Sequence, residues 1–320
     1  MMVIKYSSLE KEAMEYWSWD QNNPPRPLSF LTAKEGAGSE VRTPLMHYGT
    51  VAPVYLTVIR YLRKILEDKP KKKLKLLELG CGTGRFLGFL AQLFPNIEVW
   101  GSDYAKASIK YAKENYAKWG VKFVWGKVQK TGLKAKMFDV VISSHVIEHI
   151  LVSEGPVFLK EVKKLLKTDG WAFIGTPEVE MCQNIYQKNP KDEPKKRLIP
   201  PHLHEYGLDE LKRLAIPIFG QDQVQVDKLI NESFRKVFKA SIVKFRPGKG
   251  LLSQAKNKVY ILVRDKLPRP IFDWLVRLGT RLTFISTGVG YKEILMDNVV
   301  KTESSLVKSD NLLLVCRKNR

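Results

Sequence analysis

Residues 76–90 read LLELGCGTGRFLGFL, and this stretch decides the fold that the surrounding chain must adopt. Three glycines, Gly80, Gly82 and Gly84, fall within five positions between an apolar run and a helix-like segment. Glycine permits a tight turn at positive φ, and it lets a ligand approach the backbone where a helix begins. The stretch therefore predicts a strand, a ligand-binding loop and a helix, in that order.

The residues around the glycines restrict the class of ligand. A dinucleotide fingerprint requires a further glycine where this chain has Arg85, and a phosphate loop requires a Gly-Lys-Ser/Thr sequence that does not follow here. Glu78 stands two residues before the first glycine. Its carboxylate would repel a pyrophosphate but would attract an ammonium group, so the loop favours a ligand that carries one.

Hydrophobic patterning outside the loop predicts alternating strands and helices. Apolar runs predict strands at 74–80, 97–103, 121–126, 137–144 and 171–177, and helical spacing predicts helices at 51–67, 85–94, 105–120 and 155–170. Two further strands are expected at 224–230 and 311–318. This order is typical of an α/β fold with a doubly wound, mostly parallel sheet that carries helices on both faces.

Composition restricts the cellular compartments in which we expect the protein. The chain has 320 residues, 44% of them hydrophobic, and a formal net charge of +21 at pH 7. Its three cysteines are scattered without metal-type spacing, which argues for a reducing compartment. The first twenty residues have no apolar core of a signal peptide, and no charge-free stretch reaches the ~20 residues of a membrane span. We expect a cytoplasmic protein, with a peripheral position at the inner membrane face as an alternative.

Five segments in order resemble the class I S-adenosylmethionine-dependent methyltransferases, type 11 group, which includes ubiquinone and menaquinone biosynthesis enzymes. They are LLELGCGTG, VWGSDYAKASIKYAKEN, FDVVISSHVIEHI, FLKEVKKLLKTDGWAFIGTPE and HLHEYGLDELKRL, and together they cover about residues 74–214. The resemblance implies S-adenosylmethionine as cofactor. It also implies a Rossmann-like, seven-stranded sheet, here with an N-terminal helical lid and a C-terminal insert.

The resemblance assigns the cofactor's parts to residues of this chain. The methionine end falls to Glu78 and the loop, the ribose hydroxyls to the carboxylate that ends the second strand, and the edge between cofactor and acceptor to the Ser143/Ser144 region. The full cofactor set is Glu78, Gly80, Cys81, Gly82, Gly84, Asp103, Tyr104, Val128 and Ser143. We interpret Cys81 as a small loop residue, because a sulfonium methyl donor needs no covalent enzyme intermediate.

One position departs from the family's pattern. After the third strand the family usually has Gly-Asp, whose acid reaches the adenine amino group, whereas this chain has Lys127 there. Either Lys127 points away and the backbone of Val128 serves the adenine, or the register is shifted.

Two histidine clusters are candidates for handling the acceptor's proton. The first is His145, Glu148 and His149, which share one face if the segment is helical. In the quinone O-methyltransferase branch the corresponding segment is E-x-x-E-H and is associated with a divalent cation. His145 replaces the first Glu, so we assign no metal. Positioning within the core and proton abstraction remain alternatives, with a metal site as the weakest.

The second cluster is His202 and His204 in PPHLHEYGLDEL. Alternation in an extended segment would place both imidazoles on one side, facing the acceptor pocket. The alternative is a pair of loop histidines that caps the next helix.

The sequence lacks two motifs of nucleic-acid methyltransferases, and this restricts the class of methyl acceptor. Amino-methylating nucleic-acid enzymes of this fold carry Asn/Asp-Pro-Pro-aromatic where this chain has SSHV, and no Pro-Cys nucleophile follows that strand. We therefore predict O-methylation of a small molecule that is lipid-linked, quinone-like or saccharide. An RNA (tRNA) acceptor and a non-catalytic cofactor-binding or membrane-associated protein are the alternatives.

Chain organisation follows from the same patterns. We expect a lid segment at 1–50, a methyltransferase core at 51–230, an insert at 231–301 and the closing strand at 302–320. The insert interleaves Lys and Arg with large apolar residues, which suits an acceptor cap or contact with an anionic membrane. An ordinary helical subdomain with a basic surface fits the same pattern.

Overall fold

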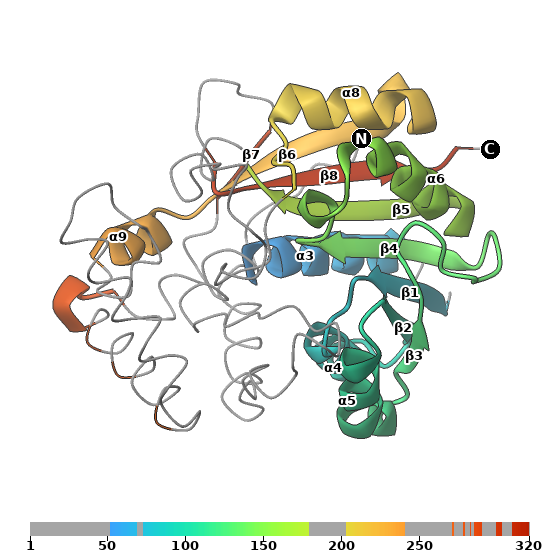
Figure 1. The fold of residues 1–320 in the computed structure, drawn as a ribbon, viewed down its shortest axis with the longest axis horizontal. Helices are drawn as coiled ribbons and strands as arrows, with labels where there is room; N and C mark the ends of the chain where they lie inside the picture. The colour runs from blue at the N-terminus through green and yellow to red at the C-terminus, as the bar shows by residue number, and fades with distance from the viewer. Residues whose placement is uncertain are drawn as a thin grey trace.

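The computed structural model describes residues 52–68, 73–178, 203–240, 285–289, 299–302 and 309–319, together with the single positions 271, 278 and 282 (Figure 1). The expected lid at 1–50, most of the expected insert and His202 lie outside the described residues.

The described residues form one eight-stranded sheet in the order β3-β2-β1-β4-β5-β8-β6-β7. The strands are β1 (Leu74–Leu79), β2 (Ile97–Asp103), β3 (Lys122–Trp125), β4 (Phe138–Ser144), β5 (Leu166–Pro177), β6 (Val224–Ile230), β7 (Val299–Thr302) and β8 (Asn311–Arg317). The five strands from β3 to β5 pair in parallel, and β8, β6 and β7 pair antiparallel. The predicted doubly wound, mostly parallel sheet is confirmed. The seven predicted strands are all present, and the short edge strand β7 adds an eighth.

The strand order reverses between β1 and β4, which are adjacent and parallel, so their carboxyl ends lie at the same edge of the sheet. In open α/β sheets, ligands bind at the carboxyl ends of the strands beside such a switch point. The glycine loop follows β1 and the Ser144–His149 segment follows β4. The topology therefore brings the two candidate segments to one edge of the sheet.

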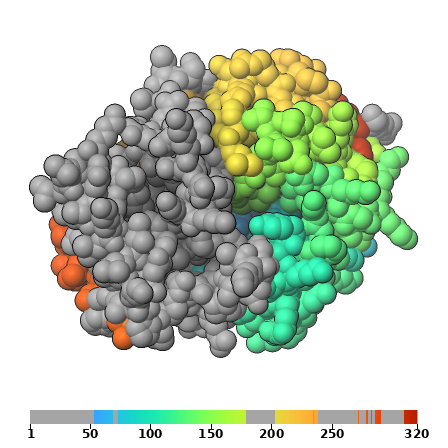
Figure 2. Space-filling view, viewed as in Figure 1, coloured from blue at the N-terminus to red at the C-terminus, as the bar shows by residue number. Residues whose placement is uncertain are grey.

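Helices cover both faces of the sheet (Figure 1). They are α3 (Ala52–Asp68), α4 (Arg85–Leu93), α5 (Lys106–Tyr116), α6 (Gly155–Leu165), α8 (Leu208–Phe219) and α9 (Glu232–Ala240), with short 3-10 helices η4 (Ala117–Trp119), η5 (Ile147–His149), η6 (Val152–Glu154) and η8 (Gln221–Gln223). Side chains of α3, α4 and α5 share one apolar cluster with the sheet, and those of α6 and α8 share the other. The surfaces of α6 and α8 lie side by side (Figure 2). No described helix is long and apolar enough to span a membrane.

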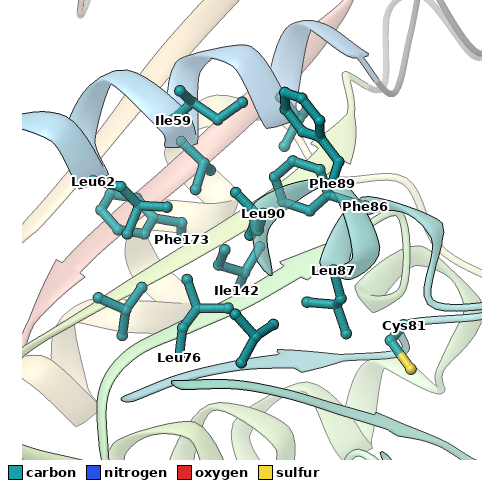
Figure 3. Close-up of a cluster of buried hydrophobic side chains, with 14 of the residues drawn as sticks. Ile59, Leu62, Leu76, Cys81, Phe86, Leu87, Phe89, Leu90, Ile142 and Phe173 are labelled. Carbon is teal, nitrogen blue, oxygen red and sulfur yellow. The ribbon is translucent and has the colours of Figure 1, made fainter. Parts of the chain in front are cut away.

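The helical spacing predicted for α3 is confirmed by its burial. Val54, Val58, Tyr61 and Ile65 are all buried against the sheet. Figure 3 shows α3 packed over α4 and over the middle strands. Each such side chain stabilises the fold by about 1.5–3 kcal/mol, so α3 is an integral layer of the core.

The helix predicted at 155–170 is too long. Helix α6 ends at Leu165, and residues 166–170 belong to β5, where Leu166 has an extended ψ of 139° and pairs with Phe138. The Lys318 ammonium donates hydrogen bonds to the carbonyls of Lys163 and Leu166, at 2.8 and 2.7 Å. A cation at a helix C-terminus is favourable. A cation from the far end of the chain therefore binds the carbonyls at the end of α6.

Candidate functional site

The glycine loop adopts the conformation that its sequence requires. Gly80, Gly82 and Gly84 have φ of 73°, 52° and 74°, in the left-handed region. A Cβ on Gly80 would lie 2.3 Å from Val146 Cγ2, and one on Gly84 would lie 2.6 Å from the ring of Phe123. A Cβ on Gly82 would meet none of the described residues within 4 Å. Gly80 and Gly84 are therefore needed for packing, whereas no described residue fills the space beside Gly82.

Asp103 ties this loop to the end of β2. Its Oδ2 accepts the N–H of Gly82 and its Oδ1 accepts the N–H of Ala105, both at 2.8 Å. The carboxylate is largely buried. An ionised carboxylate only accepts hydrogen bonds, so Asp103 is of the chemical type that suits the hydroxyl groups of a ligand. The predicted ribose ligand is thus also the residue that orders the loop.

Tyr104, the neighbouring candidate, is on the surface. Its side chain is 60% exposed, and its carbonyl accepts a hydrogen bond from Trp125 Nε1 at 2.8 Å. The Lys106 ammonium lies 4.8 Å from the Trp125 ring centroid. The ends of β2 and β3 thus present an exposed aromatic pair beside the loop.

Glu78 is buried at the end of β1, and a tyrosine of α3 holds it. Tyr55 donates its hydroxyl hydrogen bond to Glu78 Oε1 at 2.9 Å, and its ring stacks on Phe86 with centroids 3.7 Å apart. Sequence reasoning missed Tyr55. Its partner lies 23 positions along the chain, and the helical pattern alone marks only the apolar stripe of α3.

Cys81 is buried within the loop (Figure 3). Burial, and then the negative charges of Asp103 and Glu78, raise the pKa of its thiol well above the ordinary value. The thiol stays protonated at neutral pH and is not poised for nucleophilic attack.

Lys127, which stands where the family usually has an acidic residue, has an exposed side chain. Val128 is buried and packs into the cluster beneath α6 and α8. The exposure of Lys127 favours the interpretation in which it points away. An adenine contact through the backbone of Val128 remains a prediction.

The two serines that end β4 have different environments. Ser143 is fully buried and donates its hydroxyl hydrogen bond to the carbonyl of Leu79 at 3.0 Å. The Ser144 hydroxyl is also buried, and it has no hydrogen-bond partner in the described part of the chain. The Ser143 hydroxyl thus joins β4 to β1, whereas the Ser144 hydroxyl makes no hydrogen bond to a described residue.

Glu148 is the centre of the first histidine cluster. Its Oε1 lies 3.3 Å from His145 Nδ1 and 4.0 Å from His149 Nε2, and its Oε2 accepts the Thr176 hydroxyl at 3.1 Å. His145 is not on a helical face, because it precedes η5 and has a φ of 56°. The three side chains still meet, but through a strained turn rather than through helical spacing.

The second cluster joins the first through the backbone. The carbonyl of Glu148 accepts the N–H groups of Leu203 and His204, at 2.7 and 3.2 Å. The His204 ring packs edge-on against Tyr206, and its Nε2 hydrogen-bonds Glu210 in the first turn of α8. This pairing favours the interpretation of His204 as a loop residue at the start of that helix.

Metal binding was the weakest alternative for these histidines. Among the described residues, no group of three or more His, Cys, Asp or Glu side chains is arranged to hold a metal ion.

Comparisons with known proteins agree with this geometry. A family model described as a methyltransferase domain matches residues 77–174. The ubiquinone biosynthesis O-methyltransferase of Pelagibacter ubique is 33% identical over 136 residues, which are 42% of this chain and 55% of that protein. The malonyl-[acyl-carrier protein] O-methyltransferase of Acetivibrio thermocellus is 27% identical over 124 residues, which are 39% and 43% of the two chains.

A crystal structure of a SAM-dependent methyltransferase, possible histamine N-methyltransferase, from Thermotoga maritima covers 98% of this chain and 100% of its own, with 16% identity and a TM-score of 0.49. The chain spans about half the length of the curated relatives named above. The match at 77–174 contains the glycine loop, Asp103 and the Glu148 cluster. Residues 77–174 of this chain are therefore similar to a methyltransferase domain, in agreement with the resemblance that its motifs indicate.

Proposed function

We propose that this chain is an S-adenosylmethionine-dependent methyltransferase that methylates an oxygen atom of a small-molecule acceptor. The observation that carries the proposal is the meeting of three groups at one edge of the sheet. These are the open glycine loop, the Asp103 carboxylate that orders it, and the Glu148–histidine cluster after β4.

The residues present suit the cofactor. No described residue fills the space beside Gly82, which suits approach of a ligand to the loop backbone, and the Asp103 carboxylate is a hydrogen-bond acceptor that suits the ribose hydroxyls. Glu78 supplies a negative charge where the methionine end would lie. When bound, the cofactor supplies an electrophilic methyl group on a positively charged sulfur. The chain's own task is to align the acceptor and to accept its proton.

The Glu148 cluster is the proposed proton acceptor. The Glu148 carboxylate lies close to His145 Nδ1, which orients that imidazole as a carboxylate does in other histidine-dependent sites. His145 is largely buried and held by its own backbone bond to the Gly175 carbonyl at 2.9 Å. An imidazole fixed in this way can receive the hydroxyl proton of an acceptor. His149, His202 and His204 remain candidates for contacts with the acceptor.

Oxygen as the methylated atom is supported by the relatives, whose names end in O-methyltransferase. A lipid-linked, quinone-like or saccharide acceptor is supported by the mixed basic and apolar sequence of residues 231–301. The same sequence and the net charge of +21 support a peripheral contact with an anionic membrane on the cytoplasmic side. Liposome pelleting with and without anionic lipid tests this contact.

An RNA acceptor is the second candidate, because a charge of +21 suits a polyanion. Binding to tRNA that falls steeply with salt, together with methyl incorporation into tRNA, would favour it over the small molecule.

Calorimetric titration with S-adenosylmethionine and with NAD is the first test. We expect micromolar binding of S-adenosylmethionine and none of NAD, and we expect Asp103→Ala to abolish binding. The exposed Asp169 at the opposite edge of the sheet provides the control, and Asp169→Ala should bind like the parent. Because Asp103 also holds the loop, circular dichroism must show that its variant is folded. A folded parent protein that does not bind S-adenosylmethionine would overturn the proposal.

A further inference from the structure

A basic surface surrounds β3, the outermost strand on one side of the sheet. Residues 104–136 contain nine lysines and one acidic residue, Glu114, and all ten side chains are exposed. Nine positive charges against one negative charge leave a net charge of +8, out of +21 for the whole chain. The lysines belong to α5, η4 and β3, which pack together at this edge (Figure 1), and to the loop after β3. We call this set the β3-edge surface: Lys106, Lys110, Lys113, Lys118, Lys122, Lys127, Lys130, Lys134 and Lys136.

Three of these lysines form a stripe along α5. Lys106, Lys110 and Lys113 stand at positions i, i+4 and i+7, so they share one face of the helix, and all three are exposed. Like charges at this spacing repel one another, and a cation in the first turn opposes the helix dipole. No acidic residue in the first turn of α5 offsets this repulsion. A stripe that is retained at a cost to its own helix indicates a contact with a negatively charged partner.

Trp125 presents an aromatic ring within this basic surface. The residue is 57% exposed, and its Nε1 donates a hydrogen bond to the carbonyl of Tyr104 at 2.8 Å. The Lys106 ammonium lies 4.8 Å from the centroid of the ring. These two contacts restrain the orientation of the ring, so less side-chain freedom is lost when a flat group stacks on it.

Two classes of macromolecule carry many negative charges, nucleic acids and anionic membranes. Membrane binding by a surface segment requires large apolar side chains beside the basic ones. In the described part of the chain, the exposed large aliphatic residues lie outside 104–136, at Leu151, Val152, Val157, Leu203, Ile271, Leu278, Leu282 and Ile285. A basic surface with an exposed tryptophan instead suits single-stranded nucleic acid, because phosphates bind lysine and bases stack on aromatic rings.

We propose that the β3-edge surface binds single-stranded nucleic acid, with Trp125 stacking on a base and the lysines of α5 contacting phosphates. The inference goes beyond the proposed function. In the sheet, β2 and β1 separate β3 from β4, which precedes the Glu148 cluster, and the bound strand need not be a methyl acceptor. Binding is measured without cofactor, so the inference and the proposed function can fail independently.

Fluorescence anisotropy with a labelled oligouridylate of about twelve nucleotides tests the inference. We expect the parent protein to bind it with an affinity that falls steeply between about 50 and 200 mM salt. An abasic oligomer of the same length keeps the phosphates but offers no base to Trp125. It should bind about tenfold more weakly, because stacking of one base on an aromatic ring contributes at least this factor.

Trp125→Leu separates stacking from apolar contact, because leucine is apolar but has no ring. It should weaken oligouridylate binding about tenfold and remove the preference over the abasic oligomer. Trp125→Phe keeps a ring and should lose less affinity. If Trp125→Leu and Trp125→Phe weaken oligouridylate binding equally, stacking is not the contact and the inference is wrong.

The lysines are tested by the double variant Lys110→Ala/Lys113→Ala. It should lower the slope of log affinity against log salt by about 1.4, since each phosphate contact to a single strand contributes about 0.7. The matched control is Lys160→Ala/Lys236→Ala, which removes the same charge from exposed positions of α6 and α9 and should leave the slope unchanged.

Four results would overturn the inference. The parent protein could fail to bind oligouridylate, the abasic oligomer could bind equally well, or the two lysine pairs could change the salt slope equally. The fourth is pelleting of the protein with phosphatidylserine vesicles that Lys110→Ala/Lys113→Ala abolishes, in the absence of oligouridylate binding by the parent. That result would assign the β3-edge surface to a membrane instead.

Discussion

The backbone carbonyl of Glu148 accepts a hydrogen bond from the N–H of His204 at 3.2 Å, across 56 positions of the chain. The two histidine segments, which the sequence presents as competitors, are therefore joined to one residue. The Glu148 side chain meanwhile contacts His145 and Thr176. A change at Glu148 should disturb both segments together.

Glu148→Ala should lower the free energy of unfolding by about 3 kcal/mol, because it leaves the buried Thr176 hydroxyl without its acceptor and removes the carboxylate beside His145. Urea denaturation measures the change. Glu114→Ala, on the exposed face of α5, is the control and should stay within about 0.5 kcal/mol of the parent. Equal effects of the two variants would contradict the central position of Glu148.

Gly80→Ala and Gly82→Ala should separate folding from binding. Both residues have positive φ, which costs a non-glycine residue roughly 1–2 kcal/mol. The new methyl group on residue 80 would also clash with Val146, so Gly80→Ala should unfold at clearly lower urea concentration. The Gly82 variant should remain folded but lose cofactor affinity, because its methyl group would enter open space beside the loop. Retained affinity in folded Gly82→Ala would place the ligand elsewhere.

Ser143→Ala should affect stability more than binding. The Ser143 hydroxyl is bonded to the Leu79 carbonyl, so its removal should cost about 1 kcal/mol in urea denaturation. Affinity for S-adenosylmethionine should change less than about threefold. A large loss of affinity would restore the role that the resemblance assigns to Ser143.

Cys81 should resist alkylation in the folded protein. Burial and the neighbouring carboxylates raise the pKa of its thiol, so little thiolate is present at pH 8. Burial likewise raises the pKa of the Cys316 thiol. Peptide mass spectrometry after iodoacetamide treatment should find both residues unmodified in the native protein and modified in urea. Rapid native labelling of Cys81 would show that the loop opens.

Glu98 should contribute to stability at neutral pH and lose that contribution in acid. Hydrogen bonds from Lys122 and Trp100 lower the pKa of Glu98 to about 2. A carboxylate whose folded pKa is depressed stabilises the fold above its unfolded pKa of about 4.3 and ceases to do so as the pH falls toward 2. The pair with Lys122 is near the surface, so the effect should be under about 1 kcal/mol.

Urea denaturation of Glu98→Gln at several values between pH 2 and pH 6 tests this expectation. The variant should be less stable than the parent at pH 6 and should converge with it near pH 2. Glu114→Gln serves as the control. A constant difference across this range would assign the effect to packing rather than to charge.

Local features of the sequence predicted most of the fold. The spacing of Val54, Val58 and Tyr61 gave the correct helix and its buried side. The glycine loop fell where the structure has three residues at positive φ. Both features are short-range, because helical periodicity and backbone freedom are properties of a few consecutive residues.

Several errors and omissions involve partners that are distant in the sequence. The carbonyls at the end of α6 accept hydrogen bonds from Lys318, which lies 152 or more positions away. The short strand β7 forms by pairing with β6 rather than from its own pattern. Periodicity within a segment carries no information about such contacts.

The sequence by itself predicted the resemblance to methyltransferases, the mostly parallel sheet and the candidate residues at its carboxyl edge. The tertiary structure alone decided how those residues are used. The Ser143 hydroxyl is hydrogen-bonded to the Leu79 carbonyl, whereas the Ser144 hydroxyl has no hydrogen-bond partner among the described residues. The Tyr55 hydroxyl is hydrogen-bonded to the Glu78 carboxylate. The physical reason is that residue type fixes what a side chain can donate or accept, whereas strand register and helix packing fix which partner it meets.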